Sequence, residues 1–158
     1  MKNQRWFLIL LSLLLIGGIL SYILFVNQNR NRSDEVVIQA YLDNKFVLYL
    51  DEARANFNFG SISDPNQKET TFLQCISDLS ASIALYENTS YKKINMELDI
   101  SLHSLLKALQ DQNGARLQIV NNAEELQSIL NEIVRAPSDI PKTKRLSDYI
   151  SRFTTSNP

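Results

Sequence analysis

The sequence is poor in the residues that build the commonest catalytic and metal sites. In 158 residues it holds one cysteine, Cys75, and one histidine, His103. A single cysteine excludes an internal disulfide framework, and the two residues together exclude zinc sites with several Cys or His ligands. The short motifs of nucleotide-binding loops, zinc proteases, serine hydrolases and calcium loops are absent from the sequence. We therefore expect no enzymatic activity, no catalytic residue, no cofactor and no bound metal.

An excess of one charge is also missing. Lys and Arg number 16 against 17 Asp and Glu. Proteins that neutralise phosphates need a surplus of basic side chains on one face, so we expect no nucleic-acid partner. Gly and Pro, the residues that interrupt helices most often, number only four each.

What the sequence does contain is one long hydrophobic run, over residues 6–26, without a single charge. As a helix this run would rise roughly 31 Å, enough to cross a hydrocarbon core about 30 Å thick. A helix of a soluble domain would show a polar face, and this run has none. We interpret residues 6–26 as a transmembrane helix, which makes the membrane itself a partner of the chain.

A cleaved signal peptide is the main alternative to an anchor, because Lys2 and Arg5 give both kinds of segment a suitable start. A signal peptide has a shorter apolar core, of about 7 to 15 residues, and small residues at its cleavage site. After Val26 the residues are polar and mostly large, and the first alanine is Ala40. The run is therefore predicted to be an uncleaved signal anchor.

The orientation of this anchor depends on the basic residues that flank it. Lys2, Arg5 and the terminal amine stand on one side, and Arg30 and Arg32 on the other. A short basic tail is costly to translocate, whereas a long domain crosses largely regardless of its charge. We expect a cytoplasmic N-terminus and an extracytoplasmic C-terminal domain in the cell membrane, and leave the reverse orientation open.

Gly17 and Ser21 form a small-x-x-x-small spacing within this run. Such a spacing lets two membrane helices approach closely. A homodimer paired through these two residues is therefore one hypothesis, although a single spacing match also arises by chance.

The chain beyond the run is predicted to be a helical domain. The full division is a basic tail at residues 1–5, the span at 6–26, a polar tether at 27–33, the helical domain at 34–153 and a disordered tail at 154–158. Apolar residues at helical spacing predict four of its helices. The first stripe holds Ile38, Leu42, Phe46, Tyr49, Ala53 and Phe57; the second Phe72, Cys75, Leu79, Ile83 and Tyr86; the fourth Leu126, Ile129, Leu130 and Ile133; the last Leu146, Tyr149, Ile150 and Phe153.

Several helix ends have recognisable signals. Asp64 and Pro65 suit the start of the second helix, and Asn122 with Glu125 resembles a capping box at the start of the fourth. The fourth helix should end near Ala136, because the proline that follows disfavours helix at this position. The last helix is predicted over roughly residues 142–153.

The segment around residues 94–109 is ambiguous. Ile94, Met96, Leu98, Ile100 and Leu102 alternate like a strand, whereas Ile94, Leu98, Leu102, Leu105 and Leu109 form a helical stripe. We prefer the helix, because the alternation stops after Leu102 and the helical spacing continues. The fold class is then all-α, an up-and-down bundle of four or five helices after the transmembrane helix. The alternative is α+β, with a small hairpin around residues 94–120.

Three groups of residues were candidates for chemistry or binding. On the predicted helix His103 points away from the apolar stripe, so we interpret it as a surface histidine. Cys75 lies on an apolar stripe, where a thiol fills the core and its pKa rises. The basic residues Lys142, Lys144, Arg145 and Arg152 accompany the stripe of the last helix. They could contact an anionic surface, although a packed terminal helix with solvated charges has the same pattern.

We hypothesise from this organisation an anchored protein whose extracytoplasmic domain is a non-enzymatic interaction or scaffold module, with another envelope protein as its partner. The alternative is a ligand-sensing bundle. A membrane helix that leads into a helical bundle resembles the periplasmic part of chemoreceptors in outline. Since the sequence shows no second span and no signalling domain, such a sensor is expected to act through a separate signalling subunit.

Overall fold

A computed structural model describes residue 21 and residues 34–111 and 114–154. The chain divides into two units, Met1–Ile38 and Gln39–Pro158. In the first unit, Ser21 and residues 34–38 are described, and all of them are helical and exposed. Among the described residues, none of the helices combines the length and apolar character that a membrane span requires. The predicted span over residues 6–26 lies outside the described residues except for Ser21, so it stays a prediction.

The second unit is built of helices, and its described residues contain no strand. Residues 39–56 are helical, and a turn of 3-10 helix, η1, follows at Phe59–Ser61. The further elements are α2 (Pro65–Tyr86), η2 (Tyr91–Lys93), α3 (Met96–Gln110), α4 (Ala115–Asn121), α5 (Ala123–Arg135) and α6 (Ile140–Thr154). The all-α prediction is therefore confirmed for this domain.

The ambiguous segment is a helix, so the alternative hairpin around residues 94–120 is wrong. Residues on one face of α3, Leu98, Leu102 and Leu105, are fully buried, whereas Met96 and Ile100 are 66% and 67% exposed. The residues that alternate like a strand therefore belong to one helix, in which some of them face the core and others face solvent. Ile94 does not belong to the core stripe as predicted: it is 58% exposed, because it precedes α3 in the turn after η2.

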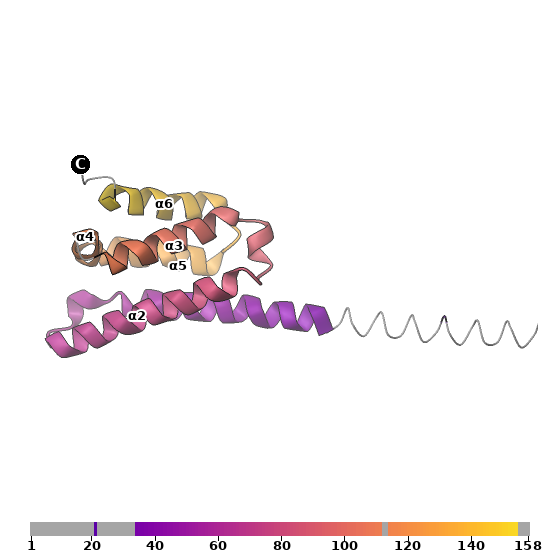
Figure 1. Cartoon of the computed structure of the whole chain (residues 1–158), viewed down its shortest axis with the longest axis horizontal. Coiled ribbons are helices and arrows are strands. Elements are labelled where there is room, and N and C mark those ends of the chain that lie inside the picture. Colours follow the sequence, from indigo (N-terminus) through magenta and orange to yellow (C-terminus); the bar gives the residue numbers. More distant parts are fainter. Residues whose placement is uncertain (1–20, 22–33, 112–113, 155–158) are drawn as a thin grey trace, which may run out of the picture. The chain divides into compact units, whose positions relative to one another are not determined.

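The long helices of this unit run in alternating directions, as an up-and-down bundle requires (Figure 1). α3 packs against both α2 and α6, and α5 packs against α6. The short helix α4 contacts α3, α5 and α6. The sequence pattern did not predict α4, because seven residues hold too few turns for a clear apolar period.

The predicted apolar stripes supply most of the core. All five residues of the second stripe, all four of the fourth, and Leu146, Tyr149 and Ile150 of the last are buried. In the first stripe, Phe46, Ala53 and Phe57 are buried as predicted. Leu50 is fully buried in place of the predicted Tyr49, and Ile38 is 59% exposed.

Two of the predicted helix starts have different outcomes. Asp64 caps α2, because its side chain accepts a hydrogen bond from the backbone N–H of Asn66 over 2.9 Å, and Pro65 is the first helical residue. Asn122 precedes α5 without a side-chain cap: its amide donates instead to the carbonyl of Gln118 over 2.8 Å. The predicted capping box with Glu125 is therefore wrong. Because α4 ends at Asn121, one residue earlier, the side-chain amide of Asn122 hydrogen-bonds to the last turns of α4 and does not cap α5.

Candidate functional site

A groove between the first half of α2 and helix α4 is the strongest candidate site. It has a volume of about 410 Å³. Its lining is mostly apolar, with three charged side chains: Phe59, Pro65, Lys68, Glu69, Phe72, Gly114, Arg116, Leu117, Val120 and Asn121. Pockets of roughly 300 to 1,000 Å³ with an apolar lining and a few polar groups are typical of binding sites.

Aromatic rings form the floor of this groove. Phe59 and Phe72 are 1% and 6% exposed, and their ring centroids lie 5.9 Å apart. Phe57 packs against Phe59 edge to face, with centroids 5.7 Å apart. Because these rings belong to the core, the floor of the groove is a rigid part of the domain.

A cation and a carboxylate lie at the edge of the groove. The guanidinium carbon of Arg116 lies 3.7 Å from the centroid of the Phe72 ring, a cation–π contact. Nη2 of the same guanidinium lies 3.2 Å from Oε2 of Glu69. Leu117, the next residue of α4, is 64% exposed. The groove thus presents an exposed leucine and a fixed cation beside an aromatic floor.

Local sequence explains this geometry. Asp64 and Pro65 start α2 so that Phe72 reaches the core two turns later. Gly114 adopts a φ of 124°, a left-handed conformation that residues with a Cβ rarely adopt, and α4 begins immediately after it. The glycine therefore sets the direction in which α4 carries Arg116 and Leu117 across the groove.

A second hollow of about 580 Å³ shares Val120 and Asn121 with the groove, and its other lining residues are mainly polar. They include Asn58, Ser61, Asn122, Glu124 and Glu125. The two hollows therefore adjoin each other; the first has a mainly apolar lining and the second a mainly polar one.

A charged cluster surrounds His103, on the outer side of α3. Nδ1 of His103 lies 3.2 Å from Oδ1 of Asp99, and the other carboxylate oxygen of Asp99 accepts a hydrogen bond from Lys92. Lys92 also donates to Glu87 over 2.6 Å. The hydrogen bonds to Asp99 and then to Glu87 raise the pKa of Lys92.

A catalytic role for this cluster would require a site where a substrate can bind. The side chain of His103 is 59% exposed, and neither of the two hollows described above includes His103 or Asp99. The surface position predicted for His103 is confirmed. The histidine does lie beside a carboxylate, but no described hollow holds a reacting group near it.

Cys75 lies in the core, as its place on the apolar stripe predicts. It is fully buried, and this burial, with a smaller effect of Asp78, raises the pKa of its thiol. In residues 34–111 and 114–154, no three His, Cys, Asp or Glu side chains are close enough together to hold a metal ion.

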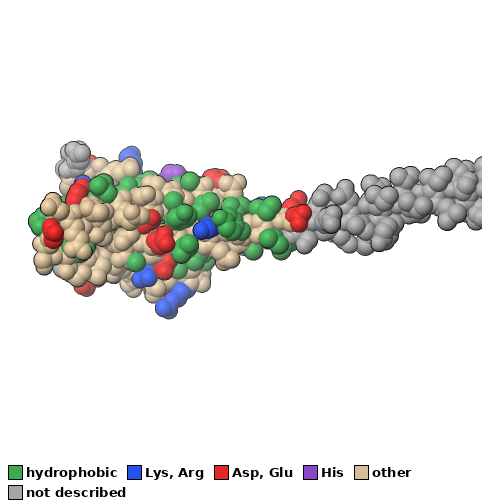
Figure 2. Space-filling view, turned by 90° about the horizontal axis from the view of Figure 1, so that it is seen from below, with side chains coloured by type: hydrophobic (Ala, Val, Ile, Leu, Met, Phe, Trp, Pro, Cys, Tyr) green, Lys and Arg blue, Asp and Glu red, His purple; other side chains and the backbone are tan. Residues whose placement is uncertain are grey.

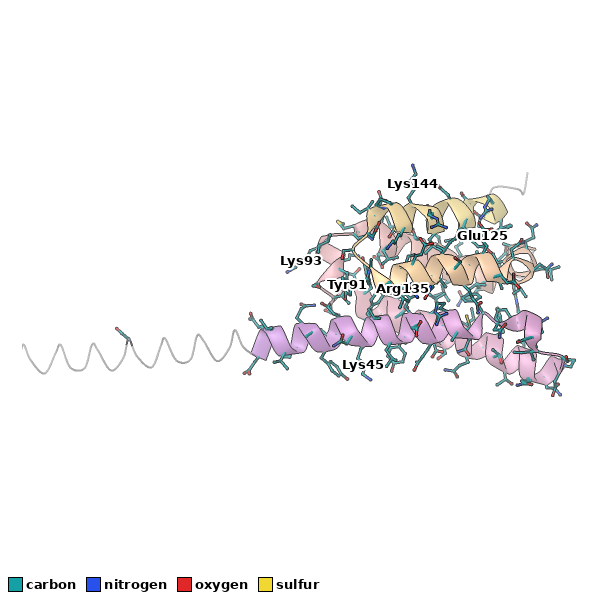
Figure 3. All side chains as sticks on the ribbon, turned by 180° about the vertical axis from the view of Figure 1, so that it is seen from behind. Lys45, Tyr91, Lys93, Glu125, Arg135 and Lys144 are labelled. Carbon is teal, nitrogen blue, oxygen red and sulfur yellow. The ribbon has the colours of Figure 1, made fainter. Side chains whose placement is uncertain are left out.

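The basic residues of α6 are mostly paired with acidic ones. Lys142 lies 3.4 Å from Asp139, Arg145 2.5 Å from Glu132 and Arg152 2.6 Å from Glu125. Lys144 is exposed and points away from the domain (Figure 3). An anionic surface that binds this helix would have to compete with three carboxylates. Of the two residues proposed for helix pairing, Gly17 lies outside the described residues and Ser21 is helical and exposed.

The face of the domain formed by residues 39–56 and α2 also exposes apolar side chains. Figure 2 shows this face, where apolar side chains lie among acidic and basic ones. Tyr41 and Leu73 are 59% and 58% exposed. Nζ of Lys45 lies 5.8 Å from the ring centroid of Tyr41 and 6.0 Å from that of Tyr49, so a cation already covers part of this surface.

Comparison with protein-family models, with curated proteins and with solved structures finds no match for this chain.

Proposed function

We propose that this chain is a single-pass protein of the cell membrane, with a cytoplasmic N-terminus, residues 6–26 as its anchor and an extracytoplasmic helical domain. In this proposal the domain has no catalytic activity and binds a segment of another envelope protein in the groove between α2 and α4. Pairing of two anchors through Gly17 and Ser21 would make the protein a homodimer.

The groove is the single observation that supports an interaction module. Strong binding energy in protein interfaces comes from a few large side chains that fill well-packed pockets. The rigid floor of Phe59 and Phe72 offers such a pocket, and Leu117 at its edge adds exposed apolar surface. Arg116 and Glu69 can fix the orientation of a partner segment by hydrogen bonds.

Site-specific photocrosslinking of the full-length chain in its own membranes tests this proposal. A photoreactive amino acid at position 117 should crosslink one defined envelope protein. Ile100 is the matched control, because it is equally exposed, at 67% against 64% for Leu117, and lies on α3 outside the groove. The same product from both positions, or no product from position 117, would contradict binding in the groove.

A ligand-sensing bundle is the second candidate, because the volume of about 410 Å³ also suits a small molecule. The two candidates differ in what stabilises the protein. A small ligand that binds the folded state raises the melting temperature of the purified chain, in a manner that depends on its concentration. A Leu117→Glu substitution should abolish that shift if the ligand occupies the groove.

A further inference from the structure

The end of the domain at which Gln39 lies carries exposed apolar side chains from two segments that are far apart in the sequence. Ile94 and Met96, around the start of α3, are 58% and 66% exposed, and Ile140, the first residue of α6, is 47% exposed. On the surface of a soluble protein, exposed apolar side chains usually occur singly, whereas these three lie in two neighbouring turns.

Asn95 holds the two turns together. Its side-chain amide donates to the carbonyl of Pro137 over 2.9 Å and to the hydroxyl of Thr143 over 2.7 Å, and the residue is only 1% exposed. Ile94 and Met96 are its direct neighbours, and Ile140 lies one helical turn before Thr143. The three apolar side chains therefore share one end of the domain.

The chain enters the domain at this same end. Gln39 donates a hydrogen bond to the carbonyl of Asn88 over 2.9 Å, and the carboxylate of Asp43 accepts two hydrogen bonds from Ser90. Residues 88–90 lead directly into η2 and the turn that carries Ile94. The predicted anchor ends at Val26, and the predicted tether at residues 27–33 can span about 10 Å as a helix or about 24 Å when extended, to which the helical residues 34–38 add about 8 Å. This end of the domain is therefore within reach of the bilayer.

Most charged side chains at this end form ion pairs within the domain. Lys92 pairs with Glu87 and Asp99, and Lys142 pairs with Asp139. Two charged side chains at this end are exposed and form no described ion pair: Lys93 (Figure 3) and Glu97, which lies in the first turn of α3 directly after Met96. Apolar side chains with one lysine and one glutamate between them suit the interface of a membrane, where apolar groups enter and charged groups stay at the headgroups.

We infer that Ile94, Met96 and Ile140 dock this end of the domain onto the lipid bilayer that holds the anchor. The inference rests on the anchor of the proposed function. Because the charges are nearly balanced, docking depends on apolar contact, and it occurs on neutral as well as anionic lipid.

Spin labels on the full-length chain test this docking. In a Cys75→Ala background, single cysteines are placed at positions 94, 96 and 140, and the labelled protein is reconstituted into vesicles of phosphatidylcholine, with or without phosphatidylglycerol. Leu73, which is 58% exposed like Ile94 but lies in the first half of α2, provides the matched control. Circular dichroism confirms that each labelled protein is folded.

Labels at positions 94, 96 and 140 should be accessible to oxygen and protected from a water-soluble nickel complex, in both kinds of vesicle, whereas the label at position 73 should be accessible to nickel. Nickel accessibility at all four positions overturns the docking. Protection from both reagents indicates protein contact and also overturns it. Vesicle flotation separates the two claims: a chain that does not float with the vesicles lacks the anchor, and a chain that floats with nickel-accessible labels refutes the docking alone.

Discussion

The side-chain amide of Asn95 donates a hydrogen bond to the hydroxyl of Thr143 over 2.7 Å in the interior of the domain. Asn95 is 1% exposed and Thr143 is 1% exposed. The bond joins the turn before α3 to the first turns of α6, across 48 residues of sequence. Tyr86 adds to this junction, because its hydroxyl donates to the carbonyl of Asn95 over 2.5 Å.

Removal of the Asn95 side chain should destabilise the domain. Asn95→Ala breaks two buried hydrogen bonds and leaves the Pro137 carbonyl without this donor, at an expected cost of about 1–3 kcal/mol. Urea unfolding of the full-length chain in mild detergent, followed by circular dichroism, measures the change. Asn44→Ala, at an exposed helical position, is the control and should change stability little. Equal stabilities of the two variants would show that the junction contributes nothing.

Two residues of the groove should differ sharply in their effect on folding. Phe72 is 6% exposed and packs in the core, so Phe72→Ala should cost about 3–5 kcal/mol. Leu117 is 64% exposed, and Leu117→Ala should change the free energy of unfolding by less than about 0.5 kcal/mol. The same urea unfolding experiment compares them. A large loss with Leu117→Ala would mean that position 117 is a structural residue and cannot report on binding.

The stability of the domain should fall at high pH through Tyr149. Burial raises the pKa of this tyrosine from 10.0 to about 12, and Glu125 adds to the shift. Between these two values the unfolded chain has lost the proton that the folded chain keeps, so stability decreases as the pH rises from 10 towards 12. Tyr149→Phe should reduce this slope, as measured by unfolding at a series of pH values. An unchanged slope would assign the pH dependence to other groups.

Cys75 should react slowly with thiol reagents in the folded protein. Its thiol is fully buried and its pKa is raised, and only the thiolate is nucleophilic. A maleimide should modify it within minutes in urea and far more slowly without urea, as followed by mass spectrometry. In the same experiment, a cysteine placed at the exposed position 73 of α2 should react at once. Rapid modification of native Cys75 would contradict its place in the core.

Much of the fold could be predicted from the sequence, because apolar residues at helical spacing mark the side of each long helix that is buried. The pattern identified Leu98, Leu102, Leu105 and Leu109 of α3, and all four are fully buried. It failed at Ile94, where a periodic residue lies in a turn. The helix α4 also escaped prediction, because its seven residues give one buried isoleucine, Ile119, and too short a period.

The candidate site could not be predicted, because it depends on contacts between distant segments. Arg116 lies on the ring of Phe72, 44 residues earlier, only because α4 crosses the start of α2. Asn95 carried no signal either. A single asparagine between Ile94 and Met96 does not reveal a partner 48 residues away, and its burial follows from the packing of α6 against α3.

The proposed function requires that residues 6–26 anchor the chain, and alkaline extraction of membranes from cells that make the full-length chain measures this. We predict that the protein stays in the membrane pellet after carbonate treatment, and that its intact mass includes residues 1–26. Recovery of the protein in the soluble fraction, or a mature chain that begins after Val26, would contradict the uncleaved anchor.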